Sequence, residues 1–341
     1  MKRELIREIM TSVASSPNRK AGLFEGKMGI CLSLYLVNKT VQASNIEKCA
    51  DKLLDEVVED ISGMHNLSFA NGLTGIGWAI NKLHENGCIW GDVDDILFNI
   101  DAVLYREVIC GTDVAISDLS DLLGTLVYLV DRVNNHVHNR ESTLHTLDVY
   151  LLRMVIDKLS HLMPSFLQKI NKDVYPSATW AFPILFYSIE KALCSGTYTN
   201  KIDNMMRLWE TQICTVMPFY HLHRLALANS LYSLNLKLKH GALDRHVDML
   251  YTSVDFKRVE DEIIPNIHSV NVGWCYAVAI LRQTLSIGVN RSDIITKCKR
   301  MIYDIVKVNV ADLRKHVSGK VCPKDISLIN GMSGLLLLFN L

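Results

Sequence analysis

The feature that most constrains the fold is a glycine phrase that returns at the start of apolar stretches. It reads Asn71-Gly72-Leu73-Thr74-Gly75 in its fullest copy, Gly26-Lys27-Met28-Gly29 near the start, and Asn330-Gly331-Met332-Ser333-Gly334 near the end. A phrase that recurs over such distances indicates a repeat architecture. We therefore expect a chain built from repeated helical units.

Apolar and amphipathic helical patterns alternate along the chain. An amphipathic pattern occupies residues 1–14, 45–61, 93–109, 144–163, 200–216, 243–252 and 291–309. Each is followed by a more apolar stretch, marked in turn by Gly26, Gly72, Asp121, Ala178, Ser230, Tyr276 and Gly331. The markers are roughly 51 residues apart, which fits two helices and their connections per repeat. Pro183 predicts that the fourth apolar helix starts late or is kinked, and we expect residues 136–143 and 253–272 to be loops.

This alternation predicts an all-α fold. A helix that is apolar on all sides must be buried, whereas a helix with one apolar stripe lies outside it. Seven repeats of both types predict an α/α toroid with seven inner and seven outer helices. No linker composition interrupts the pattern, so we expect residues 1–341 to form a single domain.

Composition excludes several classes of function. Lys+Arg and Asp+Glu are both 36, whereas a nucleic-acid-binding chain carries a basic surplus. No apolar run approaches the roughly 18 residues of a membrane span, and no signal peptide is visible. The nine cysteines are odd in number and have no close pairs, which is typical of free thiols in a reducing compartment. We therefore expect a cytoplasmic protein without a nucleic-acid partner.

The starts of the inner helices are the expected functional end of the fold. Asn71 and Asn330 are predicted to cap helix amides, and the gathered N-termini favour an anion, a thiolate or an acidic peptide. Glu25 and Asp121 stand at two of these starts. Their carboxylates either face the bowl or simply interact with the helix dipole.

The paired helices and their glycine phrases resemble the lanthionine synthetase C-like (LanC-like) family. The resemblance rests on Gly26–Ile30, Asn71–Trp78 and Ser327–Gly334, and its arrangement extends over the whole chain. It implies a peptide cyclase, in which a peptide Cys adds to a dehydrated Ser or Thr and forms a thioether ring. It also implies a zinc ion held by two Cys and one His, from a W-C-Y-G phrase in the fifth repeat and a C-H-G phrase in the sixth.

The sequence departs from the family at these two phrases. The fifth repeat reads Leu227-Ala228-Asn229-Ser230 and the sixth reads Gly273-Trp274-Cys275-Tyr276, so no Cys-His pair occurs. Cys275 is the one weak metal candidate, and Cys322 would have to supply another ligand if the phrases were displaced by one repeat. We therefore expect no cofactor, and a zinc ion stays open as the alternative. If no metal binds, Cys275 is a buried thiol on an apolar helix.

The remaining candidate residues are isolated. His268 lies ahead of the sixth repeat and, with Asp121, is a candidate for a catalytic role; the catalytic residues are otherwise unknown. The pair His221-x-His223 would point its rings apart on a helix, and the pair His136-x-His138 is expected in a loop, so surface or capping roles are expected for both.

Three functions stay open. The first is a LanC-like protein of ribosomal peptide modification with a degenerate zinc site. The second is a toroid that binds a peptide or protein partner without catalysis. The third is an α/α-toroid glycosidase or lyase, which would need two paired carboxylates, such as Glu25 and Asp121.

Overall fold

The structure, a computed structural model, describes residues 6–7, 9–11, 20–110, 119–135, 143–170, 181–263, 274–288 and 291–316. In these residues it contains helices and turns without a strand, which confirms the predicted all-α class. The helices are α2 (Lys27–Val41), α3 (Ser44–Ile61), α4 (Leu73–Glu85), α5 (Val93–Cys110), α6 (Leu119–Asn135), α7 (Thr143–Ile170), α8 (Ala181–Cys194), α9 (Thr199–Ile213), α10 (His221–Leu238), α11 (Gly241–Thr252), α12 (Phe256–Ile263), α13 (Trp274–Ser286) and α14 (Ser292–His316).

Burial separates the two kinds of helix that the sequence predicts. α2 buries ten of its 15 residues, whereas its successor α3 buries four of 18. α10 buries 12 of 18 residues, whereas α9 buries five of 15. The apolar helices therefore form the core, and the amphipathic helices cover it.

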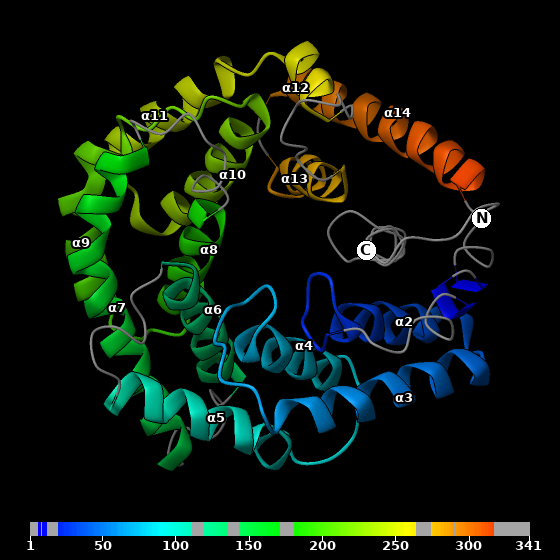
Figure 1. The fold of residues 1–341 in the computed structure, drawn as a ribbon. Coiled ribbons are helices and arrows are strands. Elements are labelled where there is room, and N and C mark those ends of the chain that lie inside the picture. The colour runs from blue at the N-terminus through cyan, green and yellow to red at the C-terminus, as the bar shows by residue number, and fades with distance from the viewer. Residues whose placement is uncertain are drawn as a thin grey trace. The chain divides into compact units, whose positions relative to one another are not determined.

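The described chain divides into two compact units. Unit 1 contains α2 to α5 and α6 up to Tyr128, and unit 2 contains α7 to α12; α13 and α14 each contribute to both. In unit 1, α2 packs against α3 and α4, and α4 packs against α5 (Figure 1). In unit 2, α10 packs against α8, α11 and α12, and α9 packs against α7 and α8. Each unit thus has a buried row and a covering row, and the predicted single domain stays a prediction.

The same turn joins an apolar helix to its covering helix in both units. α2 is followed by Gln42 and α10 by Lys239, both in the left-handed backbone region at φ 53° and 60°. The amide of the next residue donates to the side chain of an asparagine near the helix end, Ala43 to Asn38 and His240 to Asn235, at 2.8 Å in each turn. Recurrence of this turn in the first and fifth pairs is structural evidence for the repeat.

Three helix boundaries test the sequence prediction. α10 begins at His221, so the Ala228–Ser233 phrase lies inside the helix instead of at its start, which is a correction. α8 begins at Ala181, after the Ala178 marker, which confirms the predicted late start; Pro183 is its third residue, in the first turn, where proline is tolerated. α7 continues past residue 163 through Pro164 to Ile170.

A further correction concerns residues 253–272, which we expected to be a loop. Residues Phe256–Ile263 form the short helix α12, with Val259 and Ile263 buried. Five of its eight residues are charged, so its apolar pattern is too short to predict a helix. The predicted last helix from Gly331 and the His136-x-His138 pair lie outside the described residues.

Candidate functional site at the starts of the inner helices

The first amides of α2 and α4 donate to carbonyl groups of the loops that precede these helices. Lys27 N–H donates to Lys20 O at 2.9 Å, and Leu73 N–H donates to Asn66 O at 2.8 Å. The residues before the two helices are Gly26 and Gly72, and neither helix has a side-chain cap. The prediction that Asn71 caps α4 is therefore wrong. These two helix starts are satisfied by the backbone, which weakens the case for an anion site there.

Glycine is required at these starts by close backbone approach. A Cβ atom on Gly75 would lie 1.8 Å from the carbonyl oxygen of Phe69. A Cβ atom on Gly124, the sixth residue of α6, would lie 2.9 Å from the amide nitrogen of Phe69. The loop around Phe69 thus passes tightly beside both helices, and the glycine phrase serves the packing of unit 1.

Lys27, inside the first glycine phrase, is a buried cation that joins two helices. Its Nζ lies 3.1 Å from Glu56 and 3.0 Å from Asp60, both on α3. Burial opposes the charge, but the two carboxylates outweigh it and raise the pKa of Lys27. This side chain therefore ties the start of α2 to the end of α3.

The two predicted carboxylates differ in their surroundings. Glu25 is exposed in the loop before α2, and Asp121 is half-buried in the first turn of α6. A carboxylate in the first turn of a helix interacts favourably with its dipole. Asp121 fits this interpretation, whereas Glu25 precedes the residue that caps α2 and lies outside its first turn. The glycosidase alternative, which needs the two carboxylates to be paired, stays a prediction.

In unit 2 the start of α10 is capped by an acidic side chain from another helix. The carboxylate of Glu262, on α12, accepts the amide of His221 at 2.7 Å and that of Leu222 at 2.9 Å. Burial raises the pKa of Glu262, against the opposing effects of these bonds and of Arg224. The helix start thus already holds an anion supplied by the chain itself.

The two histidines at this start are buried, which corrects the predicted surface role. His221 Nδ1 accepts the amide of Asp255 at 3.0 Å. The ring of His223 packs edge-on against Tyr220, with centroids 5.6 Å apart, and is 4% exposed. Burial lowers the pKa of His223 to about 4, so this ring is neutral at neutral pH.

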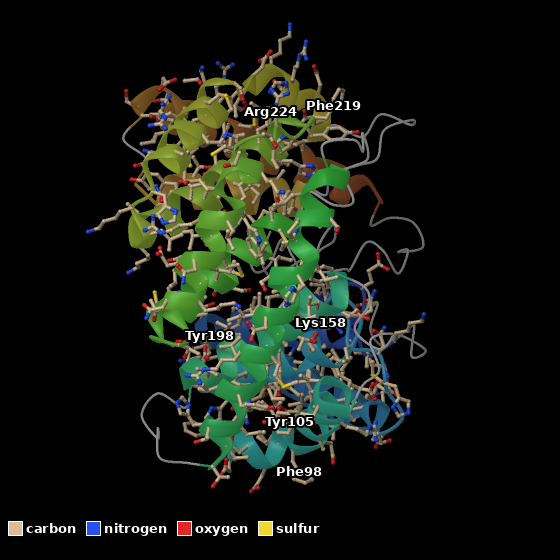
Figure 2. All side chains as sticks on the ribbon, turned by 90° about the vertical axis from the view of Figure 1, so that its left-hand side faces the viewer. Phe98, Tyr105, Lys158, Tyr198, Phe219 and Arg224 are labelled. Carbon is tan, nitrogen blue, oxygen red and sulfur yellow. The ribbon has the colours of Figure 1, made fainter. Side chains whose placement is uncertain are left out.

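Arg224 fixes the loop that leads into α10 (Figure 2). Its guanidinium donates to the carbonyl oxygens of Pro218 at 2.6 Å, Ser253 at 3.2 Å and Phe219 at 3.5 Å. Phe219, which stands in this loop, is 67% exposed. The start of α10 therefore presents a rigid loop with an exposed aromatic ring.

The residues at the fifth-repeat phrase do not fit a zinc ion. Ala228 is apolar and fully buried, and Asn229 is fully buried in a polar network. The Asn229 amide donates to Ile280 O at 3.2 Å and Thr284 Oγ1 at 3.0 Å, and its oxygen accepts the Tyr251 hydroxyl at 2.9 Å. An amide with its hydrogen bonds satisfied by α11 and α13 offers no ligand to a metal.

The residues also fail to fit a zinc ion when the family phrase is placed at the observed start of α10. If Tyr220, the residue before α10, takes the position of Gly26 and Gly72, then Pro218 takes the position of the family's Cys. Proline has no metal-binding side chain. No group of three His, Cys, Asp or Glu residues that could hold a metal ion occurs in the described part of the chain.

The structure leaves three residues that the sequence singled out untested. Cys275 is the second residue of α13, but its side chain lies outside the described residues, as does the whole of His268. Cys322 also lies outside them. Their proposed roles therefore stay predictions.

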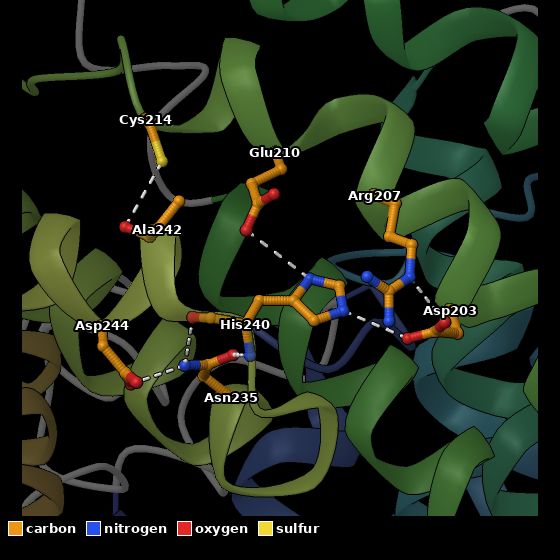
Figure 3. Close-up of polar contacts among 8 residues, drawn as sticks. All are labelled: Asp203, Arg207, Glu210, Cys214, Asn235, His240, Ala242 and Asp244. Atoms are coloured by element: carbon orange, nitrogen blue, oxygen red, sulfur yellow. Dashed lines mark hydrogen bonds and ion pairs between the residues drawn. The ribbon is translucent and has the colours of Figure 1, made fainter.

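A second polar cluster lies at the opposite end of α10, in the turn to α11 (Figure 3). The buried His240 ring is 3.1 Å from Asp203 Oδ1 through Nε2 and 3.7 Å from Glu210 Oε1 through Nδ1. Hydrogen bonds to Arg207 and then to His240 lower the pKa of Asp203, against the effect of desolvation. The imidazole separates the two carboxylates, so this cluster joins α9 to the turn and does not chelate.

One hollow of about 740 Å³ lies in unit 1 between residues 6–11 and 41–46. It adjoins the end of α2 and the start of α3. Five of its eight lining residues are apolar, and the polar ones are Arg7, Thr11 and Asn45. It therefore lies at the opposite end of α2 from the glycine phrase.

Comparison with known proteins agrees with the sequence resemblance. The family model described as lanthionine synthetase C-like protein matches residues 3–164, a little under half of the chain. No curated protein matches. None of the helices described could span a membrane. The family fold is a helical toroid, and the all-α repeat of paired helices agrees with it. Residues 3–164 of the chain are therefore similar to the lanthionine synthetase C-like family.

Proposed function

We propose that this LanC-like protein acts on ribosomally made peptides and binds them without a zinc ion at the family's site. The proposal includes a cytoplasmic location and a peptide partner. The observation that carries it is the Asn229 network, which occupies the fifth-repeat phrase with satisfied hydrogen bonds in place of a metal ligand. The family match supports the class of partner.

The missing ligand has a chemical consequence for ring closure. A free Cys thiol has a pKa near 8.5, so only a few per cent is thiolate at neutral pH. Zinc, when bound with an open position, would supply the thiolate. Within the described residues, Glu262, Arg224 and Phe219 surround the start of α10, and their chemistry suits peptide contact more than thiol activation.

The test uses full-length protein and a peptide that carries one dehydroalanine and one Cys. Fluorescence anisotropy measures binding, and mass spectrometry after thiol alkylation distinguishes the open peptide from the thioether ring. We expect binding with ring closure no faster than in buffer. A matched peptide with Ala in place of dehydroalanine controls for binding that does not depend on the electrophile.

The family's cyclase activity is the alternative outcome. Rapid formation of the ring, abolished by a chelator and by Cys275→Ala, would replace the binding role with zinc-dependent catalysis. Absence of binding to either peptide would contradict the proposal altogether.

A further inference from the structure

The short helix α12 is attached to unit 2 in two different ways. Its buried side chains, Val259 and Ile263, hold it by apolar packing. At its C-terminal end, Glu262 reaches the start of α10, 40 residues or more away in sequence. Helices α10 and α12 are in contact. α12 is therefore a separate segment laid over the start of an inner helix.

Three hydrogen bonds, made by Glu262 and Asp255, join α12 and the residue before it to the start of α10. Glu262 accepts the two first amides of α10, and the Asp255 amide donates to His221 Nδ1. In α2 the first two amides, and in α4 the first amide, donate to carbonyl groups of the preceding loop. At α10 the adjacent loop is turned instead toward Arg224, and the cap comes from a distant carboxylate.

The Glu262 carboxylate is held by opposing effects, attraction from the surrounding positive charges and a cost of burial. Arg224 on α10 and Arg258 on α12 attract it, and the helix start attracts it too. Its partial burial acts against the charged form. Breaking this contact costs a few hydrogen bonds and recovers solvation, whereas breaking the Val259 and Ile263 contacts would expose apolar surface.

We infer that α12 is a strap over the start of α10 and that the Glu262 carboxylate is its latch. With the latch closed, the first amides of α10 are unavailable to any other anion. With the latch open, the Glu262 side chain leaves this helix start while Val259 and Ile263 keep α12 packed on unit 2, and the amides become accessible to a peptide carboxylate. The role toward peptide rests on the proposed function, but the latch itself does not.

Hydrogen exchange measured by mass spectrometry on the full-length protein tests the latch. In Glu262→Ala, the segments 217–226 and 253–263 should exchange about ten-fold faster than in the wild type, because a charged hydrogen-bonded pair is lost. The rest of unit 2 should keep its rates. Added acetate should slow exchange in both segments of the variant by supplying the missing carboxylate. Glu260→Gln, an exposed change on the same helix, is the matched control and should leave both segments unchanged.

Three results would overturn the latch. They are unchanged exchange in Glu262→Ala, faster exchange throughout unit 2, and faster exchange in the two segments that acetate does not reduce. Peptide anisotropy on the same variants separates the two proposals. If Glu262→Ala opens the latch and acetate closes it, but no peptide binds, the proposed function fails and the latch stands.

Discussion

Several buried polar side chains of this chain have a partner on another helix. Lys27 pairs with two carboxylates of α3, and Asn229 bonds to α11 and α13. A buried polar group costs free energy unless its hydrogen bonds are made. These residues therefore join neighbouring helices, and their sequence neighbours give little indication of it.

His223 should make stability depend on pH. Its pKa is about 4 in the folded chain against an ordinary 6.5, so the unfolded chain takes up the proton first as pH falls. The contribution is fully present above pH 6.5 and is lost between pH 6.5 and pH 4, by about 3 kcal/mol in all. Urea unfolding at a series of pH values should show a shallower loss in His223→Gln. His161→Gln, at an exposed position on α7, should keep the wild-type dependence. Parallel curves for all three proteins would refute this role.

The Asn229 network should show coupling between its members. Asn229→Ala leaves buried groups on α11 and α13 without their partner and should cost about 3 kcal/mol of unfolding free energy, whereas Tyr251→Phe should cost about 1 kcal/mol. The double variant should cost less than the sum, because the two changes remove the same bond. Strict additivity in chemical unfolding would contradict a shared network.

At the scale of the helix, the sequence predicted most elements because burial sets their periodicity. The patterns at 45–61 and 93–109 correspond to α3 and α5 within a residue at each end. The start of α10 was missed because no glycine marks it and its apolar pattern runs on evenly from Leu222. Glu262 was missed as a site residue because its contact is with a helix start far away in sequence.

A second signal could have located the repeats. Asn38 and Asn235 each lie four residues before a left-handed helix-ending residue, and each accepts the amide that follows. An asparagine at this place in an apolar helix marks the turn to the covering helix. Sequence periodicity alone does not separate it from an ordinary polar residue.

A glycine in the turn after α10 should increase the stability of the folded protein. Lys239 is in the left-handed region at φ 60°, where a residue with a Cβ atom is strained. Lys239→Gly should raise stability by about 0.5–1 kcal/mol. Lys237→Gly, inside the last turn of the same helix, should lower it by about 1 kcal/mol. Thermal unfolding that shifts both variants in the same direction would contradict the strain.

The glycine phrase should tolerate no side chain at Gly75. A methyl group there would meet the backbone of Phe69, which cannot move aside without shifting the loop. Gly75→Ala should cost more than about 3 kcal/mol. Gly63→Ala, where no atom lies within 4 Å of the added Cβ, should change stability by less than about 0.5 kcal/mol. Equal unfolding midpoints would mean that close packing is not the reason for the phrase.

At the scale of the whole molecule, the part of the chain that matches the lanthionine synthetase C-like family model is separate from the repeats in which the resemblance places the metal ligands. The family match covers residues 3–164, which include the best-preserved glycine starts. The fifth and sixth repeats lie beyond it, and there the described residues supply packing and hydrogen bonds in place of metal ligands. The fold class was readable from the sequence because every repeat contributes to it, whereas the site depends on a few residues in two repeats.

The most direct test of this account is the zinc content of the purified full-length protein, measured by inductively coupled plasma mass spectrometry after dialysis against metal-free buffer. We predict zinc well below one equivalent per chain, with an unfolding midpoint that does not change in a chelator. One tightly held zinc per chain, lost in Cys275→Ala and kept in Cys194→Ala, whose thiol is exposed on α8, would contradict the account.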